Sequence, residues 1–389
     1  MVQAANRTKQ VGEYYFSLKM DLIRKMVAGG DDIINLAIGN PDIAPPAGVI
    51  RALADNVKAK GVHGYQPYRG IKELREAISA WYMKYYGVDT DPESQVLPLI
   101  GSKEGIMHIS MAYLNRGDAV LIPDPGYPAY AAAAGLCGAR SVYYDLNSDN
   151  NWLPDLENIE HKDLQGLKLM WINYPNMPSG QIATGDKFRE IVRFARKHNI
   201  LVVNDNPYSF ILNDMPLSLL SADEGFDNVL ELNSLSKSHN MAGWRIGMLV
   251  GHAEHINNVL KIKSNMDSGM FLPVQKAAVE ALQMGESWYN ELNAIYRHRQ
   301  ELVYKLLSAW GCKTSPGQSG MFLWSEIPAG FADSYEFSDY CLERYHLFIA
   351  PGLVFGANGQ RYIRVSLCVG ESRLKEAIER VKKDDKTNK

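Results

Sequence analysis

The chain has 389 residues, of which 46% are hydrophobic and 22% are charged, values typical of a globular protein with one large two-part domain or two ordinary domains. The formal net charge of −3 and the absence of a polybasic run argue against nucleic acid and against a membrane surface as partners. No apolar run is long enough to cross a bilayer or to form the core of a signal peptide, so we expect a cytoplasmic protein.

The spacing of cysteine and histidine indicates neither a disulfide framework nor a metal site. The four cysteines lie far apart without a CxxC pair, and we expect them to be reduced thiols. The histidines show no HxxxH spacing with a matching carboxylate, and His252 and His255 stand at the start of a polar helical pattern. We therefore expect no metal ion.

Helical and strand patterns alternate along the middle of the chain. Apolar residues from Ile71 to Tyr85 recur at helical spacing, and this pattern ends at Gly87. Further helical patterns, such as Lys187–His198, separate several short apolar runs that are each bounded by Gly, Pro or Asp. These runs are Val96–Ile100, Ala119–Pro123, Ser141–Leu146, Leu169–Tyr174, Ile200–Asn204, Val229–Asn233 and Ile246–Val250. Strands that are apolar on both faces and alternate with helices predict a parallel sheet covered on both sides.

The pattern changes after about residue 280, where a smaller α+β domain is predicted. It starts with one long amphipathic helix over Ser287–Trp310. The later elements are strands at Met321–Glu326, Leu347–Ala350 and Tyr362–Leu367 and helices at Tyr335–Tyr345 and Arg373–Lys382. We expect residues 1–45 to join this small domain of residues 281–389, and residues 46–280 to form the large domain.

The segment from Ser234 to Gly247, SLSKSHNMAGWRIG, is the most informative part of the sequence. Lys237 follows a predicted buried strand, so its amine can reach a pocket at the end of the sheet and attack an aldehyde. Arg245 and Ser234 offer a bidentate cation and a hydroxyl, which together suit a phosphate. A lone Ser-Lys pair is best explained as a solvated loop, but the whole segment matches the pyridoxal-phosphate attachment signature of class I and II aminotransferases at every constrained position.

This resemblance to class I and II aminotransferases extends over essentially the whole chain. It implies the fold of type I pyridoxal-phosphate enzymes, an α/β large domain with a mostly parallel sheet of seven strands and a smaller α+β domain. It also implies an enzyme that moves an amino group from an L-amino acid to a 2-oxo acid, with Lys237 holding pyridoxal 5'-phosphate as a Schiff base. The freed Lys237 then acts as a general base.

The resemblance assigns residues to each part of the cofactor. Asp205, at the end of a predicted strand, is expected to keep the pyridine nitrogen protonated. Tyr208 is expected to donate to the phenolic oxygen, and Tyr127 to stack on the ring. The phosphate is expected to bind at a strand-to-helix turn and at the lysine segment. These phosphate residues are Gly101, Ser102, Lys103, Ser234, Ser236 and Arg245.

Two further expectations concern the substrate and a second subunit. Arg364, on a predicted strand of the small domain, matches the arginine that binds the substrate α-carboxylate, and Gly39 matches the glycine that approaches it from the other side. Tyr65 aligns with the tyrosine that reaches the phosphate of the neighbouring subunit, although Tyr68 lies close in sequence. The expected partner is therefore a second copy of the chain, in a homodimer with shared sites.

One position departs from the family pattern. Met177 stands where the family has an asparagine that donates to the phenolic oxygen of the cofactor, and a thioether cannot donate. The neighbouring Asn176 is the candidate to take this role. Without it, Tyr208 remains the main donor.

Two other functions compete with transamination. A carbon–sulfur β-lyase or another elimination could use the same fold and cofactor. A ligand-sensing domain of a transcription regulator would need a DNA-binding module, for which residues 1–30 are too few. Side-chain specificity cannot be assigned, because Lys263, Arg297 and Arg299 are candidates only by composition and each is expected to be a charge on a helix surface.

Overall fold

Seven strands form the central sheet of the computed structural model, which describes residues 1–9 and 15–387, and all seven coincide with the predicted apolar runs to within two residues. They are β2 (Val96–Leu99), β3 (Ala119–Asp124), β4 (Arg140–Asp145), β5 (Leu167–Ile172), β6 (Leu201–Asp205), β7 (Val229–Ser234) and β8 (Gly247–Gly251). Their order is β2-β8-β7-β6-β5-β3-β4, and β8 runs opposite to the other six strands. The predicted mostly parallel seven-stranded sheet is confirmed.

Helices cover both faces of this sheet because successive strand residues point to opposite sides and both sets are apolar. One face packs against α4 (Ser102–Tyr113), α5 (Ala129–Cys137) and α9 (Ala253–Lys263). The other packs against α3 (Lys72–Tyr86), α7 (Gly185–His198) and α10 (Leu272–Leu282), and α2 (Ala47–Asn56) lies on α10. Gly87 ends α3 as predicted, with a left-handed φ of 65° that glycine adopts without strain. The short helices α6 (Leu156–Glu160) and α8 (Leu235–Ser238) complete this part.

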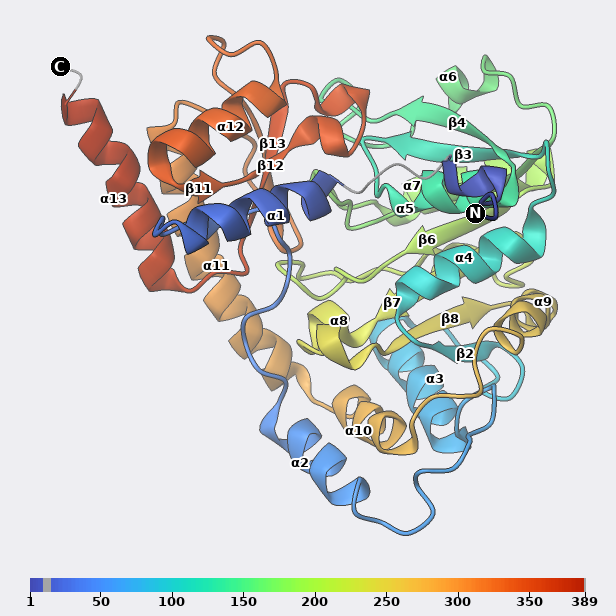
Figure 1. The fold of residues 1–389 in the computed structure, drawn as a ribbon. Coiled ribbons are helices and arrows are strands. Elements are labelled where there is room, and N and C mark those ends of the chain that lie inside the picture. Colours follow the sequence, from blue (N-terminus) through green and yellow to red (C-terminus); the bar gives the residue numbers. More distant parts are fainter. Residues whose placement is uncertain (10–14, 388–389) are drawn as a thin grey trace.

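A second apolar core lies in the part of the molecule built from both chain ends (Figure 1). Its helices are α1 (Tyr15–Ala28), α11 (Glu286–Ala309), α12 (Ser334–Tyr345) and α13 (Glu371–Thr387). An antiparallel sheet has the order β12-β13-β10-β9, with β9 (Lys313–Thr314), β10 (Phe322–Glu326), β12 (Ala350–Pro351) and β13 (Tyr362–Ser366). In Figure 1 the long helix α11 runs from this part down to α10.

The predicted strand Leu347–Ala350 is divided, which corrects that prediction. Leu347–Phe348 forms β11 and pairs in parallel with β1 (Ile34–Asn35), whereas Ala350–Pro351 pairs with β13. The chain changes partner at Ile349, so one apolar run serves two sheets. The pairing of β1 with β11 also attaches the N-terminal segment to the C-terminal part of the chain. Short 3-10 helices lie at Asn6–Lys9, Leu219–Ala222, Ala242–Trp244, Gly352–Val354 and Ala357–Gly359.

Within residues 1–9 and 15–387, the structure contains no helix with the length and apolar character needed to cross a membrane.

The direction of the strands decides where side chains can meet. Since β8 is antiparallel to both neighbours, the other six strands run the same way and their carboxyl ends share one edge of the sheet. Segments that follow β2, β3, β5, β6 and β7 therefore converge at this edge, the usual position of a ligand in an open α/β sheet.

Candidate active site

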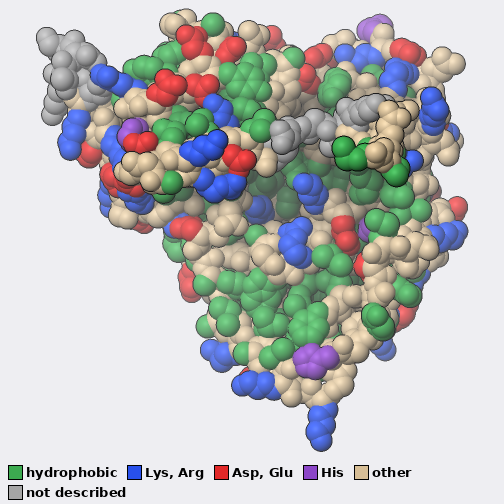
Figure 2. All heavy atoms as spheres, viewed as in Figure 1, with side chains coloured by type: hydrophobic (Ala, Val, Ile, Leu, Met, Phe, Trp, Pro, Cys, Tyr) green, Lys and Arg blue, Asp and Glu red, His purple; other side chains and the backbone are tan. Residues whose placement is uncertain are grey.

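A cavity of 410 Å³ opens at this edge and is lined by residues of both parts of the molecule. On the face drawn in Figure 2 the molecule is hollowed between its upper and lower parts, and basic side chains are visible in the hollow. The central sheet and its loops contribute Ser102, Lys103, Tyr127, Tyr130, Asn173, Met177, Asp205, Pro207, Tyr208, Ser234, Ser236, Lys237, Ala242 and Arg245. The other part contributes Phe16, Ile38, Gly39, Phe322 and Arg364. Most of the predicted site residues thus meet in one place.

Lys237 extends from α8, the single helical turn that follows β7. Ser234 begins this turn, and its Oγ accepts a hydrogen bond from the N–H of Ser236 at 3.1 Å. The Lys237 amine donates to the backbone oxygen of Gly39 at 2.5 Å. Burial lowers the pKa of Lys237, and the nearby guanidinium groups of Arg364 and Arg245 act in the same direction. A larger fraction of neutral amine makes the lysine a better nucleophile and base.

Asp205 is the last residue of β6 and is only 5% exposed. Its Oδ2 accepts a hydrogen bond from Tyr130 Oη at 3.0 Å, whereas its Oδ1 is buried without a hydrogen-bond partner among the described residues. Burial raises the pKa of Asp205 to about 7, although the bond from Tyr130 opposes this shift. Leaving a buried acceptor unsatisfied costs about 1–3 kcal/mol. A protonated ring nitrogen placed in the cavity would satisfy it, so the site fits a pyridinium ring.

Hydroxyl and basic groups gather at one end of the cavity, beside the start of α4. Ser234 Oγ and Ser236 Oγ lie 2.8 Å apart, and Arg245 approaches Gly101 so closely that a Cβ on this glycine would lie 2.2 Å from its Nη2. Gly101 also has a φ of 80°. Because Gly101 has no side chain, the Arg245 guanidinium can lie against the turn. Backbone N–H groups at a helix start, hydroxyls and a guanidinium are a donor set that suits a phosphate.

Arg364 lies on β13 at the other side of the cavity, among aromatic rings. Its Nη2 donates to the backbone oxygen of Ala37 at 2.8 Å, and its Nη1 donates to Met177 Sδ at 3.1 Å. Its guanidinium carbon is 3.9 Å from the centre of the Phe322 ring and 4.5 Å from that of Phe355. A guanidinium in apolar surroundings binds a carboxylate strongly, because water competes less for it.

Asn176, which we expected at the cofactor, is not among the described residues that line the cavity. Its side chain is used in a tight turn, where Oδ1 accepts bonds from Ser179 and Nδ2 donates to the backbone oxygen of Asn173. Met177 lines the cavity instead, together with Asn173, whose Nδ2 donates to the backbone oxygen of Asp205. The direction of each side chain depends on this turn, and a contact of Asn176 with the cofactor stays a prediction.

Six more lining residues were missed by the analysis of the sequence. They are Phe16, Ile38, Tyr130, Pro207, Ala242 and Phe322. Tyr130 had a local signal, because it follows Tyr127 by one helical turn at the start of α5. Tyr65, in contrast, is 91% exposed in the loop between α2 and α3 and is not among the described residues that line the cavity.

The three basic side chains considered for specificity are not cavity residues in the part of the chain that the structure describes. Arg299 is only 5% exposed and forms a bidentate ion pair with Asp42 at 2.6 and 2.8 Å, which corrects its assignment as a surface charge. Lys263 is fully buried, against the same expectation. Arg297 is exposed, as expected, and pairs with Asp214 at 2.9 Å.

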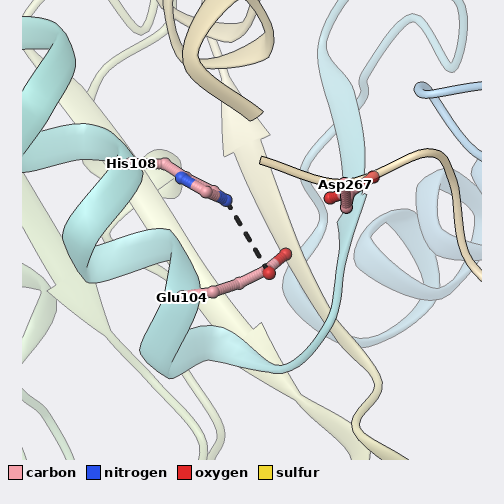
Figure 3. A group of neighbouring side chains, drawn as sticks. All are labelled: Glu104, His108 and Asp267. Atoms are coloured by element: carbon pink, nitrogen blue, oxygen red, sulfur yellow. Dashed lines mark ion pairs between the residues drawn. The ribbon is translucent and has the colours of Figure 1, made fainter. Parts of the chain in front are cut away.

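A separate group of ionisable side chains includes the partner of Lys263. Glu104 and His108 of α4 and Asp267, which follows α9, have ligand-type atoms within 4.8 Å of one another (Figure 3). The Lys263 ammonium lies 2.7 and 2.9 Å from the two Asp267 oxygens. Because this ammonium already balances the charge of Asp267, a divalent cation would be repelled at close range. We regard the group as a partly buried ion cluster.

Comparison with known proteins gives consistent results. The family model described as aminotransferase class I and II matches residues 31–381. An LL-diaminopimelate aminotransferase of Dehalococcoides mccartyi is 38% identical over 379 residues, 97% of each chain, and one of Halothermothrix orenii is 37% identical over 99% of each. Among solved structures, substrate-bound BacF of Bacillus subtilis has a TM-score of 0.94 at 35% identity over 98% of each chain. An aspartate aminotransferase of Thermotoga maritima has a TM-score of 0.90 at 28% identity, covering 99% of this chain and all of its own.

Proposed function

The chain belongs to the class I and II aminotransferases, and from this premise we propose a role for each group of residues in its cavity. It is a pyridoxal-phosphate-dependent enzyme that moves an amino group from an L-amino acid to a 2-oxo acid. The relatives reported above whose names state an activity are named as aminotransferases, which favours transamination over the competing β-lyase reaction.

The cofactor, when bound, accepts electrons from the Cα of the amino acid and so makes its proton removable. We assign the ring nitrogen to Asp205, because its Oδ1 is buried and unsatisfied. Tyr208 faces the phenolic oxygen; burial raises the pKa of Tyr208, so its hydroxyl keeps the proton that it donates. Tyr127 stacks on the ring. The phosphate binds Ser102, Lys103, Ser234, Ser236 and Arg245 at the turn that Gly101 opens.

Lys237 both attaches the cofactor and moves the proton at Cα. Its amine donates to the backbone oxygen of Gly39, and the ring of Phe322 lies close to both Gly39 and the Arg364 guanidinium. Arg364 is near enough to Lys237 to lower the pKa of this amine, so a carboxylate bound by Arg364 would place Cα close to the amine. Since burial lowers the pKa of Lys237, part of the freed amine is neutral and can accept the proton.

Two copies of the chain are proposed to share their sites. Figure 2 shows hydrophobic side chains gathered on the lower part of one face, in the region of α2 and α10. Exposed apolar side chains of α2 and of the segments before α3 and α10 are Ile50, Val57, Tyr65, Tyr68, Met266 and Phe271. An exposed apolar surface of this kind supports a protein interface. In a symmetric dimer it would bring Tyr65 to the partner's phosphate site.

We also propose domain boundaries and a location in the cell. The boundaries at residues 45 and 280 divide the chain into the N-terminal segment, the large domain and the small domain. A cytoplasmic location is supported by the four cysteines, which are free in the structure.

Covalent labelling tests the role of Lys237. Reduction of the cofactor-loaded protein with borohydride, followed by peptide mapping, should attach the cofactor to Lys237. The Lys237→Ala variant should bind the cofactor without covalent attachment and should show no transamination. A label on another lysine would refute the assignment.

Mixed dimers test the role of Tyr65. A Lys237→Ala chain and a Tyr65→Ala chain, each inactive alone, should regain activity when mixed, because one of the two sites then combines an intact Lys237 with an intact Tyr65. The test requires that Tyr65→Ala is itself strongly impaired. If mixed dimers form and no activity returns, the shared site is excluded.

A further inference from the structure

We infer that the amino donor carries an uncharged, apolar side chain of the leucine, methionine or phenylalanine type. The inference rests on the proposed function, because it takes Arg364 as the site of the α-carboxylate. Two observations support it: the charged groups that line the cavity, and the side chains that surround Arg364.

The charged groups of the cavity are all required by the cofactor and the α-carboxylate. Among the described residues, four cationic side chains and one acidic side chain line it. Lys103 and Arg245 lie at the phosphate end, Lys237 attaches the cofactor, and Arg364 faces the α-carboxylate. The acidic side chain, Asp205, faces the ring nitrogen. No lining charge of the described chain remains for a second carboxylate or a second ammonium group on the donor.

The walls near Arg364 are apolar and come from distant segments of the chain. Phe16 lies on α1, Ile38 precedes Gly39, and Phe322 lies on β10. The ring centres of Phe16 and Phe322 are 5.9 and 3.9 Å from the Arg364 guanidinium carbon. Met177, which accepts a hydrogen bond from Arg364, adds a thioether where the family has a polar amide.

An apolar donor suits these walls better than a charged one does. Its side chain would leave water for apolar neighbours, which is favourable. A charged side chain would lose its hydration without gaining an ion pair from this chain. The curated relatives are named for LL-diaminopimelate, whose far end carries both an ammonium and a carboxylate. The inference therefore separates this chain from those relatives.

Binding of unreactive acids tests the inference without turnover. The probes are 3-phenylpropionate, which has one carboxylate and an apolar end, and pimelate, which has the carbon skeleton of diaminopimelate and two carboxylates. Calorimetric titration of the cofactor-loaded protein should give at least about tenfold tighter binding of 3-phenylpropionate. Equal or tighter binding of pimelate would overturn the inference.

Donor kinetics give a second reading on the same preparation. The ratio kcat/KM should be higher for L-phenylalanine and L-leucine than for L-aspartate and LL-diaminopimelate. A preference for either charged donor would overturn the inference and would assign the missing counter-charge to the second subunit. Borohydride labelling of Lys237 in this preparation keeps the two hypotheses apart: without the label the proposed function fails, and with it only the inference fails.

A matched pair of variants locates the effect. Ile38→Ala should lower kcat/KM for L-leucine about tenfold more than for L-alanine, because only the longer side chain reaches the wall. Ile295→Ala, the same substitution at a 37% exposed position of α11, should leave the ratio of the two donors unchanged. An equal loss for both donors in Ile38→Ala would show that this wall supports the structure and does not select the donor.

Discussion

Asp205 and Glu231 lie on neighbouring strands, both are buried carboxylic acids, and each has one oxygen without a hydrogen-bond partner among the described residues. Their surroundings differ. Asp205 lines the cavity, whereas Glu231 Oε2 accepts bonds from Asn204 Nδ2 and from the N–H of Leu219 inside the protein. Glu231 is not among the described residues that line the cavity. An unsatisfied buried acceptor therefore indicates a ligand only where it faces a space that can hold one.

The two acids also differ in how their charge can be balanced. Burial raises the pKa of both. On the proposed function, a bound cofactor would bring a protonated nitrogen to Asp205 and so keep this carboxylate ionised. No cofactor nitrogen would lie beside Glu231, so burial favours its protonated, neutral form. A neutral acid can also donate a hydrogen bond from the oxygen that lacks a partner. On the proposed function, a buried carboxylic acid thus has a catalytic role at Asp205 and a structural role at Glu231.

The largest expected effect separates the two acids by activity. Asp205→Ala should lower kcat by about a hundred- to a thousandfold, on the scale of other preorganised electrostatic groups. Glu231→Gln should leave kcat within about threefold, since it preserves the shape and the neutral state. Steady-state kinetics on both variants, with circular dichroism as a check of folding, provide the measurement. Near-normal turnover in Asp205→Ala would show that Asp205, like Glu231, has no catalytic role.

A smaller effect concerns stability against pH in the cofactor-free protein. An acid with a raised folded pKa keeps its proton in the folded state while the unfolded chain loses it, so stability falls as pH rises through that interval. For Asp205 the interval runs from about 4 to about 7, and the loss amounts to about 4 kcal/mol.

Urea unfolding at about pH 4.5 and about pH 8 measures this loss. Asp205→Asn should remove the contribution of Asp205 to the pH dependence of the unfolding free energy. Loading the wild-type protein with cofactor should remove the same contribution. The contribution of Glu231 should persist after loading and disappear only in Glu231→Gln. If cofactor loading left the pH dependence of the wild type unchanged, the proposed pairing of Asp205 with the ring nitrogen would be wrong.

The smallest expected effect concerns Met177. Because it lines the cavity and contacts Arg364, Met177→Asn should lower kcat/KM for L-leucine relative to L-aspartate by about tenfold or less. The pH titration of the cofactor absorbance should change little. A clear downward shift of that titration with an unchanged donor ratio would instead support the role of a second donor to the phenolic oxygen.

Local patterns in the sequence were sufficient to predict the sheet, the family and its cofactor. Most strands of the large sheet are short apolar runs that end near a Gly, Pro or Asp, and such runs favour buried strands. The segment around Lys237 and the position of Asp205 after a strand likewise depend on residues near in sequence. These features could be predicted without knowledge of the contacts between distant segments.

Tertiary structure decided the features that depend on distant partners. Arg299 is buried because Asp42 lies opposite it, and the strand after α12 is divided because β1 and β13 both require a partner. Met177 rather than Asn176 reaches the cavity because of the turn that they share, and Phe16, Ile38 and Phe322 meet there from separate segments. The sequence determined which chemical groups are present and which strands form, because those depend on local periodicity and neighbouring residues. Which side chains face the substrate was decided only when long-range packing set their directions.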